Sequence, residues 1–546
     1  MIDQLREELA EAVRKSGIDP EGALELERTK DIAFGDLSSN APLVFAKPAG
    51  LAPMQLAEKI VAHLSIDPAI ILKVEIAAPG FLNFTFSAPF LENQLRAISD
   101  QGPRYGRSDA GRGKRALVEF VSANPTGPLT VGHGRGAVLG DTISSILAWN
   151  GYMVEREYYY NDAGLQIQRL GASVQARYLE ALGRDFEFPE EGYQGDYIRD
   201  IAAEIITDQG EDLTEVSDFS SAAIGSIFKG ISKTLEGMGI RFDNFVNELD
   251  LHKTGKNGQS AISEVIDTLK AKGVIVERDG ATWIKAEALE GDKDKVLIKS
   301  SGEPTYRLPD IAYHRDKIER GYDLIIDIFG ADHFDTYPDV IAGVKELGLP
   351  TDRIKVLIHQ FVTLIKGGQQ VKMSTRKASF VTLDELLEEV GADVVRYFFL
   401  AKTMSSPLKF DLELALKSSD DNPVYYLKYA HARMVNILKR GAAAEMRPDV
   451  DGADLSLLRL PEERLLLHLL WLFPEVVKNT GKSLEPHHIA IYLDELAKAF
   501  HRYYTVARVV TDDMKLSLAR LVITDACRQT LANGLTVLGI EAPDRM

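Results

Sequence analysis

Residues 120–137 read FVSANPTGPLTVGHGRGA and place two prolines, several glycines and one histidine, His133, in a single turn. The β-branched run Leu117–Val121 predicts a strand before this turn, and the apolar spacing of residues 134–151 predicts a helix after it. In an open α/β sheet, ligands bind where a strand leads into a helix, because the helix N-terminus presents free N–H groups. Glycines let a ligand approach the backbone. The turn therefore predicts a nucleotide-binding site with His133 as a hydrogen-bond donor.

Two alternative interpretations of the turn remain. Gly132, Gly134 and Ala137 fit the G-x-G-x-x-A pattern of a dinucleotide-binding fingerprint, and Glu155 lies about where a ribose-binding acid would follow. The first glycine of that fingerprint follows its strand directly, whereas two prolines lie between Val121 and Gly132 here. The second alternative is a glycine-rich turn with a solvated histidine. The sequence contains no G-x-x-x-x-G-K-[ST] phosphate loop.

A second polar cluster, KMSTRK at residues 372–377, follows the strand-like run FVTLI. Lys-Gly-Gly at 366–368 predicts a hairpin between the two, and Thr382 and Glu385 have the spacing of a capping box that opens the next helix. Mobile cations beside small hydroxyl groups suit a triphosphate whose charge grows during displacement. On its own, such a cluster is more typical of a solvated basic loop.

The helices and strands that would position these two turns fall into three regions along the chain. Residues 1–108 begin with helical periodicity and end with alternating strands, which predicts an α+β N-terminal domain. Residues 109–415 alternate strands and helices, which predicts a Rossmann-like catalytic domain with a parallel sheet and an insertion at about 165–300. Residues 416–546 carry only helical signals, which predicts an all-α C-terminal bundle. The fold class is therefore α/β multidomain.

Composition limits the classes of protein that the chain can belong to. The 546 residues suffice for several cores, and they contain neither an apolar run that could span a membrane nor a signal-peptide core. The single cysteine, Cys527, excludes an intramolecular disulfide and a Cys-ligated zinc cluster. The net charge of −18 argues against a nucleic-acid partner, but the acidic excess lies before residue 431. We expect a cytoplasmic protein whose C-terminal region is still compatible with nucleic-acid binding.

The two polar stretches together resemble the signatures of the class I aminoacyl-tRNA synthetases. TVGH at 130–133 is similar to the HIGH motif, and KMSTR at 372–376 is similar to the KMSKS loop. The stretches YYYNDAG, YRLPDIAYH, NPVYYLKYAHARM and LTVLGIEAPDRM resemble arginyl-tRNA synthetases of the bacterial type, and the resemblance extends over essentially the whole chain. It implies ATP-dependent ligation of L-arginine to tRNA(Arg) through an arginyl-adenylate, with release of AMP and pyrophosphate.

The resemblance also implies site residues. The implied catalytic residues are His133, Lys372, Ser374 and Arg376. The implied ATP-binding residues are Thr130, Gly132, His133, Gly134, Met373, Asp332 and His333. The implied arginine-binding residues are Glu119, Ser122, Asn124, Tyr306 and Asp310, a set whose carboxylates suit a guanidinium. The implied anticodon-binding residues are Tyr426, Tyr429 and Arg433, a set whose rings could stack on unpaired bases.

Partners and cofactors follow from the same resemblance. Besides L-arginine and ATP, it implies tRNA(Arg) as the partner, held at its elbow by the N-terminal domain, and arginine activation that requires bound tRNA. Mg²⁺ is expected to accompany ATP, with no dedicated metal site and no tightly bound cofactor. We expect no membrane association and a monomer.

The sequence departs from the family pattern at two positions. Thr130 stands where the HIGH motif has its first histidine, and Thr375 stands where KMSKS has its second lysine. A lysine that sometimes precedes HIGH is matched here by Gly127, so Arg376 or Lys377 is the candidate for the missing charge. Two alternative functions remain open: a class I ligase or nucleotidyltransferase for another substrate, and an inactive tRNA-binding paralogue.

Overall fold

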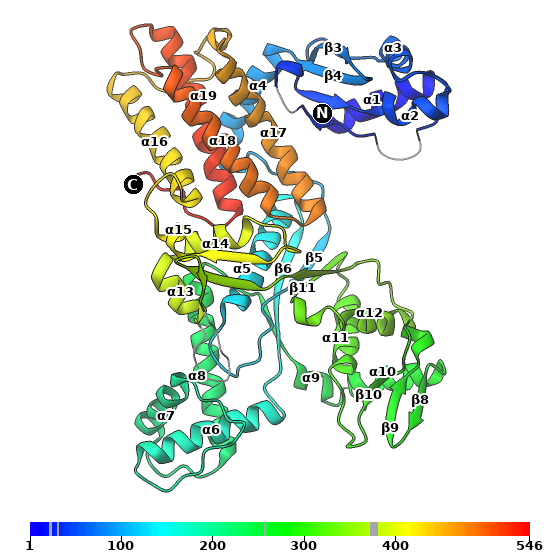
Figure 1. Ribbon diagram of the computed structural model, residues 1–546, viewed down its shortest axis with the longest axis vertical. Helices are drawn as coiled ribbons and strands as arrows, with labels where there is room; N and C mark the ends of the chain where they lie inside the picture. The colour runs from blue at the N-terminus through cyan, green and yellow to red at the C-terminus, as the bar shows by residue number, and fades with distance from the viewer. Residues whose placement is uncertain (21–23, 30–31, 256–257, 290, 372–380) are drawn as a thin grey trace.

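The computed structural model describes residues 1–546 apart from 21–23, 30–31, 256–257, 290 and 372–380. A central parallel sheet separates the two ends of the elongated molecule (Figure 1). The N-terminal region and the helical bundle lie at one end, and two excursions from the sheet lie at the other (Figure 1).

The N-terminal region is an antiparallel sheet of order β1-β2-β4-β3 packed with helices. The amphipathic helix α1 buries Leu5, Leu9 and Val13, which recur at helical spacing and face the core. The elements of this region are α1 (Ile2–Lys15), β1 (Glu27–Arg28), β2 (Leu37–Ser39), α2 (Ala41–Ala49), α3 (Pro53–His63), β3 (Ile71–Ala77), β4 (Phe81–Phe86) and α4 (Ala88–Gln101).

The central sheet has the order β12-β11-β5-β6-β7, and every neighbouring pair is parallel. Helices cover both faces, as the nearly continuous apolar strands require. Ala116 and Val118 of β5 join the core on the α5 side, whereas Leu117 joins a second core with α11 and α12. The elements are β5 (Arg115–Glu119), α5 (Val131–Trp149), β6 (Met153–Tyr160), β7 (Asn244–Asn247), α11 (Arg307–Glu319), β11 (Leu324–Gly330), α12 (Tyr337–Glu346) and β12 (Ile354–His359).

The segment expected as one insertion at about 165–300 consists of two excursions. After the first excursion the chain returns to the central sheet as strand β7, which pairs with β6, and the second excursion follows β7. Sequence periodicity missed β7 because the strand is only 4 residues long. The first excursion holds α6 (Leu165–Ala181), α7 (Asp196–Gln209) and α8 (Val216–Gly237). The second holds α9 (Glu248–His252), α10 (Ala261–Ala271), β8 (Ile275–Arg278), β9 (Ala281–Ile284) and β10 (Lys295–Ile298).

A small sheet of order β14-β13-β15 follows the central sheet. The hairpin predicted at 366–368 is present, because Gly367 and Gly368 both adopt positive φ between β13 and β14. The predicted capping box is also present, with Thr382 and Glu385 at the start of α13. The elements are β13 (Val362–Lys366), β14 (Gln369–Gln370), α13 (Leu383–Val390), α14 (Ala392–Leu400), β15 (Leu408–Asp411) and α15 (Leu412–Leu416).

The C-terminal region is a bundle of long helices, as predicted. Its helices are α16 (Pro423–Ala443), α17 (Pro461–Ser483), α18 (His487–Val506) and α19 (Met514–Val537). Helix α17 also packs against the N-terminal region, where the ring centroids of Phe86 and Trp471 lie 4.5 Å apart. Within the described part of the chain, no helix is both long enough and apolar enough to cross a membrane.

Candidate active site

The turn that opens the first motif begins with a strained backbone. Strand β5 ends at Glu119, and Val121 and Ser122 adopt φ values of 67° and 43°. Left-handed backbone at non-glycine residues costs on the order of 1–3 kcal/mol per residue and is concentrated at functional sites. The hydroxyl of Tyr158 fixes the turn by donating to the carbonyl of Ala123 at 2.8 Å. The chain therefore leaves the sheet sharply at its carboxyl edge.

A row of three buried carboxylates crosses the sheet at this edge. Glu119 of β5 is in register with Asp327 of β11 on one side and with Glu157 of β6 on the other. Two cationic side chains at the C-terminal end of helix α11, Lys317 and Arg320, contact this row. Arg320 pairs with Glu157 at 2.6 Å, and the fully buried Lys317 pairs with both Asp327, at 2.5 Å, and Glu119.

The buried ion pairs shift the titration of both partners. Burial opposes the charge of Asp327, but Lys317 and His314 hold the pKa of Asp327 below its usual range. Burial also opposes the charge of Lys317, yet Asp327 and Glu119 hold the pKa of Lys317 above its usual range. Both Glu119 oxygens are engaged, one by Lys317 and the other by the Ser122 hydroxyl at 2.8 Å. Glu119 and Ser122, two predicted arginine ligands, thus contact each other, and Glu119 also contacts a cation of the chain.

A second acidic group surrounds Tyr159. Burial raises the pKa of the Tyr159 phenol far above its usual range, and nearby Asp310, Glu248 and Glu119 raise it further. The phenol donates to Glu248 at 3.1 Å, and the Asn161 amide donates to the same carboxylate at 2.7 Å. Within the described part of the chain, neither Asp310 nor Glu248 forms an ion pair. Burial and neighbouring acids raise the pKa of Asp310 to about 7.

Glu248 was missed by the sequence analysis. It opens the short helix α9 directly after β7, at the same carboxyl edge as Glu119. The available signal was a carboxylate after a strand, but β7 itself was not recognised. Burial raises the pKa of Glu248 above its usual range, although the Tyr159 hydrogen bond opposes this.

Two further predicted arginine ligands flank this acidic group. The Asn124 side chain accepts from the Asn161 backbone N–H at 2.9 Å and donates to Gln166 at 3.3 Å. Tyr306 precedes α11, and its carbonyl accepts from the Asp310 N–H at 3.2 Å. Tyr306 and Asp310 therefore lie one helical turn apart. The Tyr306 ring is 69% exposed and available to a ligand.

The HIGH-like turn caps helix α5 through Thr130 and His133. The Thr130 hydroxyl accepts from the His133 N–H at 3.4 Å, and the Thr130 N–H donates to His133 Nδ1 at 3.2 Å. Burial lowers the pKa of His133, and the nearby Asp332 carboxylate opposes this. The turn is joined to α13 by a hydrogen bond of 2.8 Å from the Leu383 N–H to the Leu129 carbonyl.

The glycines of the motif serve different purposes. A Cβ at Gly132 would meet only Thr130, at 3.6 Å, so this position leaves space for a ligand. A Cβ at Gly134 would lie 2.6 Å from the Leu383 side chain, so Gly134 serves close packing rather than an open cradle. The Tyr197 hydroxyl lies 3.1 Å from the corresponding position at Gly127, which leaves little room for a lysine there.

Asp332 and His359 lie near His133, and His333 follows Asp332 in the chain. His359 ends β12, beside Gly330, and burial lowers the pKa of His359 to about 4. His333 stacks on Phe329 with ring centroids 5.0 Å apart, and both His333 and Asp332 are exposed. His359 is a second residue that sequence reasoning missed. The predicted residues of the KMSKS-like loop lie outside the described part of the chain: Lys372, Met373, Ser374, Thr375, Arg376 and Lys377.

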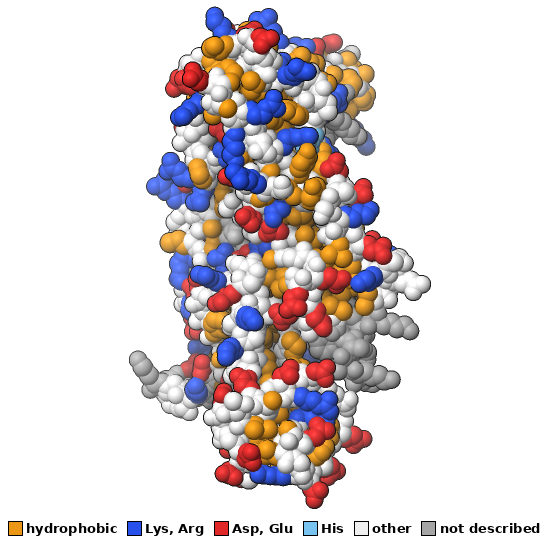
Figure 2. Space-filling view, turned by 90° about the vertical axis from the view of Figure 1, so that its left-hand side faces the viewer, with side chains coloured by type: hydrophobic (Ala, Val, Ile, Leu, Met, Phe, Trp, Pro, Cys, Tyr) orange, Lys and Arg blue, Asp and Glu red, His pale blue; other side chains and the backbone are white. Residues whose placement is uncertain are grey.

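An aromatic strip on the bundle contains the predicted anticodon residues. The His501 ring lies 4.6 Å from the Tyr426 ring and 5.9 Å from the Tyr429 ring, and the Arg433 guanidinium lies over Tyr429 at 4.9 Å. Tyr504, 5.2 Å from Arg433, continues the strip into a pocket. On the face drawn in Figure 2, Lys and Arg side chains gather over the upper half of the molecule, where the bundle lies.

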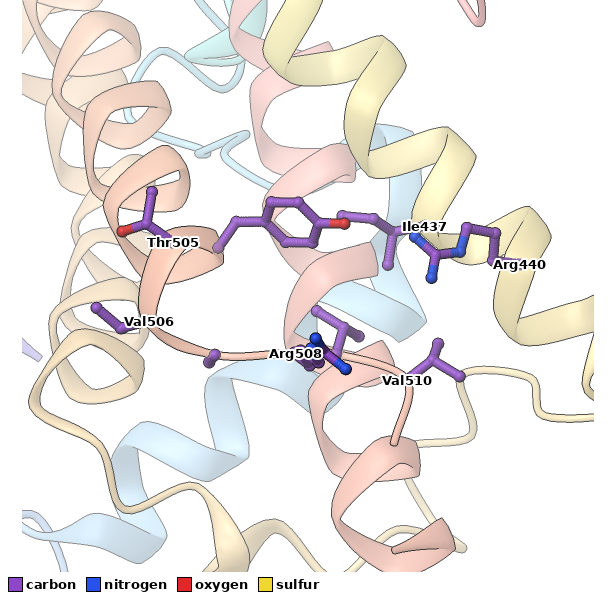
Figure 3. Close-up of a pocket in the computed structure, with 9 residues that line it drawn as sticks. Ile437, Arg440, Thr505, Val506, Arg508 and Val510 are labelled. Carbon is purple, nitrogen blue, oxygen red and sulfur yellow. The ribbon is translucent and has the colours of Figure 1, made fainter. Parts of the chain in front are cut away.

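The pocket beside this strip has a volume of about 660 Å³. Arg440 and Ile437 of α16 face the end of α18 and the following loop across it, as Figure 3 shows. Arg508 and Val510 of that loop form the floor in this view (Figure 3). Its lining thus combines two arginines, one tyrosine and one threonine with aliphatic side chains.

Comparison with known families assigns almost the whole chain. Residues 94–398 match the catalytic domain of class I tRNA synthetases for arginine, and residues 3–86 match the N-terminal domain of arginyl-tRNA synthetases. Residues 427–546 match the DALR anticodon-binding domain.

Similar proteins agree with this assignment. The arginine–tRNA ligase of Desulfotalea psychrophila is 47% identical over 529 residues, which cover 96% of this chain and 95% of the relative. That of Chlorobium phaeobacteroides is 47% identical over 553 residues and covers 100% of both. An arginyl-tRNA synthetase structure from Campylobacter jejuni has a TM-score of 0.77 and 31% identity, covering 84% of this chain and 100% of that one. The Thermus thermophilus enzyme has the same fold, with a TM-score of 0.78, 24% identity and 100% of both chains covered. The chain therefore belongs to the arginyl-tRNA synthetase family of class I aminoacyl-tRNA synthetases.

Proposed function

We propose that the carboxyl edge of the central sheet binds L-arginine and ATP side by side, so that the chain performs the reaction of its family. That reaction is the ATP-dependent ligation of L-arginine to tRNA(Arg), with an arginyl-adenylate as intermediate. The observation that carries the proposal is the pair of acids beside Tyr159, Asp310 and Glu248, neither of which forms an ion pair with any described residue. Carboxylates match the planar donors of a guanidinium, and burial strengthens such pairs.

The arginine side of the site is built from Asp310, Glu248 and Tyr306, with Asn124 and Asn161 at its border. Glu119 and Ser122 support this side of the site without binding the guanidinium directly, because Glu119 already pairs with Lys317. The substrate guanidinium supplies the counter-charge that Asp310 and Glu248 lack. An uncharged side chain such as that of citrulline would leave both acids without a partner, and it is therefore rejected.

The ATP side is built on the turn at Thr130–Gly134, with Asp332 and His333 opposite. His133 contributes a donor to the nucleotide, and Gly132 leaves room for it. Lys372, Met373, Ser374 and Arg376 complete the ATP site by family resemblance, and ATP arrives as its magnesium complex. In-line displacement at the α-phosphorus then depends on positioning and charge stabilisation.

Replacement of His133 tests the ATP side. His133→Ala is expected to lower tRNA-dependent, arginine-dependent pyrophosphate exchange by about 10²–10³-fold, because that is the usual effect of losing one such donor. Exchange without tRNA is expected to be silent in the wild-type enzyme. A loss under about tenfold in a folded His133→Ala variant would contradict the assignment.

Replacement of Glu248 tests the arginine side. Glu248→Gln keeps the shape and removes the charge, so KM for arginine should rise about 10–100-fold, since hydrogen bonds between charged groups contribute about 1.5–3 kcal/mol. The exposed Glu287, replaced in the same way, is the matched control. Unchanged KM for arginine in Glu248→Gln would remove Glu248 from the site. A panel of amino acids in the same assay tests the alternative substrates.

The two ends of the chain bind tRNA. Residues 1–108 contact the elbow, and the bundle at 416–546 binds the anticodon loop through Tyr426, Tyr429 and Arg433. The neighbouring pocket, with Tyr504 and two arginines, has the size and chemistry for an unpaired base and its phosphate. Residues 109–415 form the catalytic domain between them. The protein acts as a cytoplasmic monomer, which light scattering of the purified chain would test.

A further inference from the structure

Thr130 takes part in a reciprocal cap at the start of helix α5. Its hydroxyl accepts from the His133 N–H at 3.4 Å and also lies 3.3 Å from His133 Nδ1. Its own N–H donates to Nδ1 at 3.2 Å. The usual reciprocal cap ends in a Glu or Gln side chain. Here the third helical residue is a histidine, so the cap fixes an imidazole.

This cap determines which ring nitrogen carries the proton. A nitrogen that accepts from a backbone N–H carries no hydrogen, so the neutral ring must carry its hydrogen on Nε2. Protonation of Nδ1 would place its N–H opposite the Thr130 N–H, and the repulsion between the two donors would open the cap. Two titratable groups on neighbouring elements face this ring, Asp332 after β11 and His359 of β12. Burial disfavours the imidazolium, whereas Asp332 favours it.

We infer that Thr130 is a positioning residue that holds His133 as a neutral Nε2–H donor. This inference rests on the proposed role of His133 toward ATP. It also explains why a threonine can stand where the HIGH motif has its first histidine, because the Thr130 side chain caps the N-terminus of α5. A second contact fixes the position from the other side, since Thr130 forms an isolated antiparallel bridge with Thr382. Thr130 thus acts on ATP through His133.

Two substitutions separate this role from a direct contact with ATP. Thr130→Val keeps the shape and removes the hydroxyl, and it should lower the rate of pyrophosphate exchange about fivefold, the equivalent of one N-cap at about 1 kcal/mol. KM for arginine should stay unchanged. Thr130→Ser restores the capping oxygen and should recover most of the loss. The thermal midpoint of each variant shows whether it folds.

The tautomer of His133 provides a readout that does not depend on activity. In enzyme labelled with ¹⁵N-histidine, the His133 signals are identified by their absence in His133→Gln. The wild type and Thr130→Ser should show a protonated Nε2 and a bare Nδ1. Thr130→Val keeps the N–H that donates to Nδ1 but loses the hydroxyl that lies 3.3 Å from Nδ1 and accepts from the His133 N–H, so the ring is held less firmly and should show mixed tautomers. A single unchanged tautomer in Thr130→Val would overturn the inference. If His133→Ala remains active, the proposed ATP role fails, and the tautomer signals still decide the role of Thr130.

Discussion

The ammonium of Lys317 lies 2.5 Å from the carboxylate of Asp327, in the middle of the sheet's carboxyl edge and without access to solvent. The same ammonium contacts Glu119, so one cation of the chain holds two adjacent acids. These acids come from neighbouring strands in register. The pair therefore lies beneath the proposed arginine site.

Removal of this cation should destabilise the protein in a pH-dependent way. Lys317→Met leaves the buried Glu119 without a counter-ion and leaves Asp327 with only the His314 imidazole, which costs about 3–5 kcal/mol. The pKa of Glu119 in the folded variant then rises further above that of the unfolded chain, so the variant binds extra protons and loses stability as pH rises. We expect the thermal midpoint of Lys317→Met to fall from pH 5 to pH 8 relative to the wild type. Lys317→Arg, which keeps the charge, is the control, and an equal loss at every pH would contradict this explanation.

A second buried cation joins three parts of the chain. The Arg396 guanidinium donates to the carbonyls of Leu538 and Met238, which follow α19 and α8, and pairs with Asp141 of α5 at 2.5 Å. The carboxyl ends of two helices favour a cation at this point. Arg396→Met should therefore destabilise the protein by about 3–5 kcal/mol. The exposed Arg112, replaced by Met, is the control, and similar thermal midpoints for both variants would contradict the role of Arg396.

The raised pKa of Asp310 predicts how arginine binding depends on pH. Because the pKa of Asp310 is about 7, the free enzyme carries a partly protonated carboxyl at neutral pH, whereas the guanidinium requires the ionised form. KM for arginine should therefore fall as pH rises from 6 to 8, while KM for ATP stays flat. Asp310→Asn should abolish this dependence and raise KM for arginine. A parallel pH profile for both substrates would contradict the assignment.

The raised pKa of Asp310 affects stability in the opposite direction to arginine binding: stability falls as pH rises, whereas arginine binding improves. A carboxyl whose pKa is raised on folding binds more protons in the folded state than in the unfolded one, so stability falls as pH rises between the two pKa values. For Asp310 that interval runs from about 4 to about 7. Asp310→Asn should therefore melt at a higher temperature than the wild type at pH 8, and at a similar temperature at pH 4. This gain in stability at the expense of substrate binding is typical of a binding site.

Local patterns in the sequence were sufficient for much of the fold. Apolar patterning predicted β5 and α5, and the Gly367–Gly368 hairpin followed from turn chemistry, because these features depend on neighbours in sequence. Strand β7 was missed since four residues carry too little periodicity, and Glu248 was missed with it. The row from Glu157 to Asp327 exists only through strand register, which no local pattern encodes. The capping role of Thr130 was hidden because His133 replaces the usual Glu or Gln.

Asp36 connects the N-terminal region to the bundle. Its buried carboxylate accepts from the Phe86 N–H at 2.6 Å, from Arg464 of α17 at 2.7 Å and from His468 of α17 at 3.0 Å. Asp36→Asn keeps the shape and removes the charge that these donors share. The two regions proposed to bind tRNA would then lose their fixed spacing, so one tRNA could no longer meet both without an additional cost of ordering.

We expect KM for tRNA to rise about tenfold in Asp36→Asn, equivalent to one charged hydrogen bond at about 1.4 kcal/mol. KM values for arginine and ATP should not change, because the sheet edge does not contact Asp36. Asp67→Asn, on an exposed turn of the same region, is the matched control. If Asp36→Asn unfolds at the wild-type temperature and keeps the wild-type KM for tRNA, the ion pairs to α17 do not set the spacing of the two regions. If all three KM values rise together, the change has reached the sheet, and the N-terminal region acts on the active site rather than on tRNA alone.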